Sequence, residues 1–241
     1  MSRFVRLLLV LSLFGALSAC SSAPKSTKKN TSKTFRTVVI DAGHGGKDSG
    51  AHRRAAPPEK TVALDVARRL DRKLRESQLK TVMTRSSDVF ISLDRRVAIQ
   101  SKQKNSIFVS IHFNDSRRRG IRGFETYYNS PNARELANRI QEKLLTIPNS
   151  ANRGVHAANF RVLRLATYPA VLVECGFLSN RRERNRARDS EFRELLADRI
   201  AEAIVEQRYG TGVYHARTLV EAEPQPPSEG PGLVPRTLRR E

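Results

Sequence analysis

The chain has 241 residues, enough for one domain of ordinary size with a substantial core and tails. It carries 44 Lys and Arg residues against 24 Asp and Glu, a formal net charge of +20. So basic a chain favours a polyanionic partner, although the charge alone does not identify the polyanion and a solubilising surface is the alternative. No Gly-x-Ser-x-Gly motif occurs in the sequence, which argues against a serine hydrolase.

The N-terminus has the pattern of an export signal. Arg3 and Arg6 precede apolar residues 7–14, a stretch too short to span a bilayer, and small residues then lead to Cys20. We therefore predict a signal peptide over residues 1–19. Leu-Ser-Ala-Cys also resembles the lipobox of bacterial lipoproteins, which implies cleavage before Cys20 and lipidation of its thiol. The alternative is an ordinary signal peptide followed by a coincidental cysteine.

The predicted export of the chain limits which polyanions it can meet. We expect no nucleic acid, which leaves cell-wall polymer, lipopolysaccharide or anionic lipid as the polyanion. In a Gram-negative host, the absence of Asp after Cys20 favours a lipid anchor on the periplasmic face of the outer membrane. With Cys20 lipidated, only Cys175 remains, so we expect no intrachain disulfide and a buried thiol at Cys175.

The composition divides the remaining chain into three parts. Residues 20–35 are rich in Ser, Thr and Lys and predict a flexible tether, whereas residues 211–241 are rich in Pro, Glu and Arg and predict a disordered tail. Between them, strand and helix patterns alternate over residues 36–210. This alternation predicts an α/β fold with a single mixed, mostly parallel β-sheet of about six strands and helices on both faces.

The predicted elements follow in chain order. Strands are expected over residues 37–40, 79–85, 106–112, 123–129, 160–165 and 170–176. Helices are expected after Pro58, over 92–100 with Leu93 and Val97 facing inward, over 131–146, and from 192 to about 209. The helix after Pro58 carries a buried stripe at four-residue spacing, made by Val62, Val66, Leu70 and Leu74.

The first strand ends in the sequence Asp-Ala-Gly-His-Gly-Gly, which places His44 in a loop. A phosphate-binding P-loop does not fit, because Asp48 stands where Ser or Thr would follow the lysine, and a dinucleotide loop would need glycine at the same position. The neighbouring glycines leave space for a metal ion, a phosphate or another backbone segment to approach the imidazole.

A second histidine, His112, ends another strand, and the carboxyl ends of parallel strands lie along one edge of a sheet. Glu59 lies near a helix start, where the helix dipole favours its ionised form, and Glu174 lies near the end of the last strand. We expect these four residues to meet. Two imidazoles and a carboxylate form the ligand set of a hydrolytic zinc site, and a further carboxylate can act as general base.

Seven segments resemble, in order, the signatures of the zinc-dependent N-acetylmuramoyl-L-alanine amidases, the family of the bacterial cell-separation amidases. The resemblance covers about residues 37–209. It implies that His44, Glu59 and His112 bind one Zn2+ per chain and that Glu174 is the catalytic residue. The segments are VVIDAGHGGKDSGA, EKTVALDVARRL, TRSSDVFISLDRR, FVSIHFND, GFETYY, ANFRVLR and PAVLVECGFLSN.

The resemblance also implies a substrate and its partners. We expect hydrolysis of the amide between the lactyl group of N-acetylmuramic acid and L-alanine in peptidoglycan, in cell-wall remodelling or daughter-cell separation, by a monomer held to the membrane through Cys20. Only about two dozen residues separate Tyr128 from Arg153, room for one packed helix but not for an added helix that plugs the site, so we expect no requirement for an activator protein. The alternatives are a non-catalytic wall-binding lipoprotein and a zinc peptidase that cuts within the stem peptide.

Overall fold

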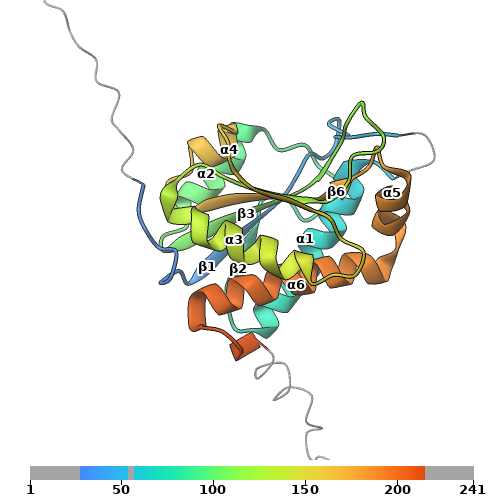
Figure 1. The fold of residues 1–241 in the computed structure, drawn as a ribbon. Coiled ribbons are helices and arrows are strands. Elements are labelled where there is room, and N and C mark those ends of the chain that lie inside the picture. The colour runs from blue at the N-terminus through green and yellow to red at the C-terminus, as the bar shows by residue number, and fades with distance from the viewer. Residues whose placement is uncertain (1–27, 54–56, 215–241) are drawn as a thin grey trace, which may run out of the picture.

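The computed structural model describes residues 28–53 and 57–214 (Figure 1). One six-stranded sheet has the order β2-β1-β3-β6-β4-β5. Neighbouring strands run parallel except β4 and β6, which are antiparallel, so the mixed, mostly parallel α/β sheet is confirmed. The strands are β1 (Thr37–Ala42), β2 (Lys80–Met83), β3 (Ser106–Asn114), β4 (Phe124–Tyr128), β5 (Asn152–Ala157) and β6 (Ala170–Phe177).

Helices cover both faces of this sheet, but unequally (Figure 1). The long helices α1 (Glu59–Glu76), α3 (Pro131–Leu145) and α6 (Ser190–Tyr209) pack together over one face and enclose the larger core. The shorter α2 (Leu93–Lys102) and α4 (Arg161–Arg164) cover part of the other face with a smaller core, and α5 (Arg181–Arg188) packs against β6 and α6. None of the helices in the described ranges has the length and apolar character needed to cross a membrane.

Alternation along the strands assigns side chains to the two cores. Val38 and Ile40 of β1 join the larger core, whereas Val39 between them joins the smaller one, as the two-residue period of a strand requires. The same alternation separates Glu174 from Cys175 in β6, because Cys175 is buried as a free thiol in the larger core. The expected stripe of α1 is buried too, at Val62, Val66, Leu70 and Leu74.

One predicted strand is wrong. Residues 160–165 contain the short helix α4, which buries Val162 and Leu163 in the smaller core. The strand of this region is instead β5 (Asn152–Ala157), which lies at the edge of the sheet with mostly exposed side chains. An edge strand does not need an apolar run, so the sequence pattern gave no signal for β5.

Leu93 does not face inward as expected, since its side chain is 51% exposed at the start of α2. The packed region also extends beyond the predicted limits of 36–210. Thr31 and Phe35, in the predicted tether, are buried, and so is Tyr214, in the predicted tail, whose hydroxyl donates a hydrogen bond to Asp198. Cys20, the signal peptide, the first half of the tether and most of the tail lie outside the described residues.

Candidate active site

The loop after β1 holds His44 in an unusual backbone conformation. His44 has a φ of 59°, in the left-handed region that costs a non-glycine residue about 1–2 kcal/mol. Buried arginine side chains hold this loop by its carbonyl groups. Arg96 donates to the His44 carbonyl at 2.6 Å, and Arg85 donates to the Gly43 carbonyl at 2.6 Å. These hydrogen bonds offset the backbone strain and fix the position of the His44 backbone, from which the imidazole extends.

A buried ion pair lies directly below the loop. Asp41 is 1% exposed and Arg96 is 3% exposed, and their side chains are 2.6 Å apart. Thr84 and Ser110 also donate their hydroxyls to the Asp41 carboxylate, at 2.6 and 2.7 Å. Because each oxygen of Asp41 has partners, the buried charge is compensated, and β1, β3 and α2 are joined below the site.

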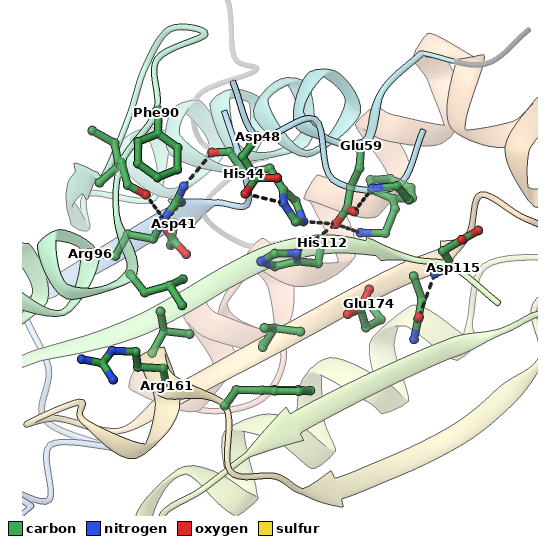
Figure 2. Close-up of a pocket in the computed structure, with 18 residues that line it drawn as sticks. Asp41, His44, Asp48, Glu59, Phe90, Arg96, His112, Asp115, Arg161 and Glu174 are labelled. Atoms are coloured by element: carbon green, nitrogen blue, oxygen red, sulfur yellow. Dashed lines mark hydrogen bonds and ion pairs between the residues drawn. The ribbon is translucent and has the colours of Figure 1, made fainter. Parts of the chain in front are cut away.

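Three of the expected site residues converge at one carboxylate oxygen (Figure 2). Glu59 opens α1, and its Oε1 lies 3.1 Å from His44 Nε2 and 2.9 Å from His112 Nδ1. One potential ligand atom from each of the three residues lies within 4.8 Å of the others. Two imidazole nitrogens and one carboxylate oxygen at this spacing form the donor set of a divalent metal site that leaves room for further ligands.

Two glycines make this convergence possible. A Cβ atom at Gly43 would lie 2.4 Å from Cε1 of His112. A Cβ atom at Gly50 would lie 2.5 Å from Oε2 of Glu59, and the φ of Gly50 is +62°. The glycine-rich loop therefore allows close approach, as the sequence indicated, and the groups that approach are the site's own side chains.

The charges of the three residues are coupled. Burial alone would raise the pKa of Glu59, but the hydrogen bonds and charges of His112 and His44 hold its pKa far below the usual range. Burial would likewise lower the pKa of His44, but Glu59 and Asp48 raise it. A divalent cation would add positive charge beside the Glu59 carboxylate, and it would bind only nitrogens that carry no proton.

Asp48 is a residue of the site that the sequence analysis missed. Its Oδ2 lies 2.9 Å from Nδ1 of His44. An ionised carboxylate only accepts hydrogen bonds, so Nδ1 carries the proton and Nε2 faces Glu59. The available signal was a carboxylate four residues after His44 in the same glycine-rich loop.

Glu174 lies beside this donor set without joining it. It is the partner of His112 in the β3–β6 register and lines the same pocket. Its Oε2 is buried and has no hydrogen-bond partner among the described residues. Burial, followed by the charges of Glu59 and Glu125, raises the pKa of Glu174 well above its usual value. A buried polar atom without a partner indicates that a ligand, water or ion completes the site.

The pocket itself has a volume of about 620 Å³ and two kinds of wall. His44, Glu59, His112 and Glu174 lie on its polar side (Figure 2). Phe90, Leu93 and Phe160 form an apolar side, and their side chains are 45%, 51% and 41% exposed. A ligand larger than a single amide group and with both polar and apolar surface fits these walls.

Comparison with known protein families assigns the chain that carries this site to a family. The model of the N-acetylmuramoyl-L-alanine amidase family matches residues 38–206, a stretch that contains all four site residues. The chain belongs to this amidase family. The amidase is therefore a hydrolytic enzyme of peptidoglycan, and its family places it in the cell envelope, outside the cytoplasm.

Relatives agree with this assignment. The N-acetylmuramoyl-L-alanine amidase LytC of Bacillus subtilis is 36% identical over 70% of this chain and 35% of LytC. The catalytic domain of CwlV, an amidase from Bacillus (Paenibacillus) polymyxa var. colistinus, is 38% identical with a TM-score of 0.67, over 71% of this chain and 97% of that one. The CwlD amidase of Clostridioides difficile, solved in complex with the GerS lipoprotein, is 30% identical with a TM-score of 0.68, over 71% of this chain and 98% of CwlD.

The buried ion pair below the loop gives a first prediction. We expect Arg96→Met to destabilise the amidase by roughly 3–5 kcal/mol, because it leaves the Asp41 carboxylate buried without its cation. Urea unfolding followed by circular dichroism measures the loss. The control is Lys33→Met, which removes an ion pair with Glu135 that is exposed on both sides and should cost less than about 1 kcal/mol. Equal losses in the two variants would contradict a special role for the buried pair.

Proposed function

We propose that the amidase hydrolyses the bond between the lactyl group of N-acetylmuramic acid and L-alanine with a zinc ion held by His44, Glu59 and His112, and with Glu174 as the proton carrier. One observation carries the proposal. Nε2 of His44 and Nδ1 of His112 meet at Oε1 of Glu59, beside a second glutamate whose buried oxygen has no described partner. Cell-wall remodelling or daughter-cell separation is the process that such cleavage would serve.

The proposed mechanism divides the work between the two glutamates. A zinc ion in this donor set supplies Lewis acidity to an attacking water and to the substrate carbonyl. Glu174 accepts the proton of the water and later delivers it to the departing L-alanine nitrogen. Burial raises the pKa of Glu174, which suits a group that must hold a proton between these two steps. Asp48 keeps Nδ1 of His44 protonated and so directs Nε2 inward.

We also propose that the site is open without an activator. The segment between β4 and β5 folds into the single helix α3, which buries Ala133, Leu136 and Ile140 and packs on α6. No residue of α3 lines the catalytic pocket. The complex of CwlD with the GerS lipoprotein raises the competing possibility of a lipoprotein partner, and activity of the purified amidase alone separates the two.

The remaining part of the proposal concerns location. We propose that the exported chain is anchored through lipidated Cys20, on the periplasmic face of the outer membrane in a Gram-negative host. The arrangement in the sequence supports this, because a short apolar stretch and small residues precede Cys20. Tethering would then limit the action of a site that α3 leaves open.

The function is tested by the products of digestion. We expect the purified mature amidase, with zinc and no added protein, to release intact stem peptides with free L-alanine amino groups from peptidoglycan, and metal chelation to abolish the release. Mass spectrometry identifies the products. Shortened peptides still attached to muramic acid would show a zinc peptidase instead. A folded, zinc-loaded protein that yields no products would favour the wall-binding alternative or a missing partner.

Two substitutions separate the proposed roles. We expect Glu174→Ala to keep zinc but to reduce turnover at least about a hundredfold, because the proton carrier is lost. His44→Ala should lose both zinc and turnover, because one of three ligands is gone. Metal content and stem-peptide release are measured on variants shown to be folded by circular dichroism. A folded Glu174→Ala protein without zinc would contradict these roles.

The anchor has its own test. We expect the full-length protein expressed in a bacterial host to sediment with membranes and to carry an added lipid mass at Cys20. The Cys20→Ala variant should appear in the soluble exported fraction, because no thiol is present to carry the lipid. Cell fractionation and mass spectrometry give the result. A soluble, unmodified wild-type protein would show an ordinary signal peptide.

A further inference from the structure

A second cavity lies next to the catalytic pocket and is lined mainly by arginines. It has a volume of about 650 Å³, close to that of the catalytic pocket. Its arginines come from three separate segments: the loop after His44, the connection from β3 to β4, and the start of α5. The lining arginines are Arg53, Arg117, Arg119, Arg181 and Arg184, together with the hydroxyl residues Ser116 and Ser179.

Most of these arginines lack an acidic partner. Arg53 pairs with Asp115, but none of the ion pairs in the described parts of the chain involves Arg117, Arg119 or Arg181. The contact between α1 and α6 is different, since Arg69 and Arg193 there both pair with Asp65. Unpaired guanidinium groups gathered around a cavity favour an anionic ligand, and their planar donors match the two oxygens of a carboxylate.

The one carboxylate of α5 is turned away from this cavity. Glu183 is buried and accepts backbone hydrogen bonds from Gly123 at 2.7 Å and from Phe177 at 2.6 Å. It therefore ties α5 to β4 and β6 and is not among the residues that line the arginine cavity. The positive charge of the cavity is left without compensation by its own helix.

Hydrogen bonds hold the walls of the cavity together. The backbone N–H of Ser116 donates to Oγ of Ser179 at 3.0 Å, and the side-chain amide of Asn180 donates to the carbonyl of Arg119 at 3.1 Å. Asn180 also caps α5 by accepting from the backbone of Arg182 and Glu183. These bonds fix the backbone from which Arg117, Arg119 and Arg181 extend, while their exposed guanidinium groups are left available to a ligand.

The two cavities meet at one ion pair. Asp115 lines the catalytic pocket, its partner Arg53 lines the arginine cavity, and the next residue, Ser116, lies on the arginine side. Figure 2 shows Asp115 at the end of the catalytic pocket beyond His112 and Glu174. An extended ligand that leaves the catalytic pocket over Asp115 would therefore enter the arginine cavity.

From this arrangement we propose that the arginine cavity is a subsite for carboxylate groups of the stem peptide, so that it selects peptides by their free acids. The inference rests on the proposed amidase function, because the catalytic pocket must hold the bond at the first residue of that peptide. The peptide ends in an α-carboxylate when it is not cross-linked, and acidic residues within it add others. Arg117, Arg119 and Arg181 pair with these groups.

The test measures binding without turnover. A fluorescently labelled stem peptide with free carboxylates is compared with the same peptide carrying carboxamides, by anisotropy with the zinc-loaded amidase at 0.15 M salt, where distant surface charges are screened. We expect the acid form to bind at least about tenfold more tightly, and Arg117→Gln/Arg181→Gln to abolish this preference. The matched control is Arg36→Gln/Arg134→Gln, which removes two exposed arginines outside both cavities and should keep it.

Three results would overturn the subsite. The wild-type protein could bind both peptides equally, or the two double variants could lose affinity equally, which would show an effect of net charge alone. The Arg117→Gln/Arg181→Gln protein could also keep its preference for the acid peptide but lose binding to anionic phospholipid vesicles, which would make the surface a membrane face.

Cleavage is measured separately, so that the two proposals can fail independently. On soluble muramoyl peptides with free carboxylates, Arg117→Gln/Arg181→Gln should raise KM at least about tenfold and leave kcat unchanged, because the subsite lies outside the reacting centre. Intact cleavage with equal KM for acid and amide substrates would remove the subsite and keep the amidase. Acid-selective binding without any cleavage would keep the subsite and remove the proposed amidase activity.

Discussion

The Glu59 carboxylate is the point at which distant parts of the chain meet. It accepts contacts from His44 after β1 and from His112 in β3, and also from the backbone N–H groups of Ala51 and Phe113. A buried carboxylate with fewer partners would be costly, but these donors and the positive end of α1 compensate its charge. The sheet, the first helix and the glycine-rich loop are therefore held in register by a group that also belongs to the site.

The support below the loop has a complementary role. Arg96 pairs with Asp41 and also holds the carbonyls of Ala42 and His44, so a helix on one face of the sheet restrains the strained residue at its edge. Such strain persists only where the surroundings over-determine the backbone. The position of the imidazole thus depends on the buried pair of Asp41 and Arg96, which also lines the base of the pocket.

The sequence allowed prediction of elements that bury apolar residues and of residues that chemistry marks by type. The central strands β3 and β6 are apolar runs. His44 was recognisable because it lies in a glycine-rich sequence that fits neither a helix nor a strand. The edge strand β5 has no such run, and Leu93 faces the pocket although its helical spacing suggested the core. The edge position of β5 and the exposure of Leu93 depend on which other elements pack on these segments. A local sequence pattern carries no information about that packing.

The same limit applies to the site. Histidines and glutamates at strand and helix ends were recognisable, and the family resemblance assigned their roles. Arg96 and Asp41 lie 55 positions apart in sequence, and their pairing follows only from the fold. The arginine cavity is a similar case. The excess of basic residues is visible in the composition, whereas the gathering of arginines from three separate segments around one cavity follows only from the fold.

The residue after Glu174 is a cysteine, and its burial protects it from oxidation. Cys175 follows Glu174 directly, yet the strand sends the thiol into the larger core on the opposite face of the sheet, where burial raises its pKa well above the usual value. A thiol kept protonated and away from solvent reacts slowly with oxidants and offers no soft thiolate to compete for a metal. The alternation of side chains along β6 therefore protects a cysteine that is the direct sequence neighbour of Glu174.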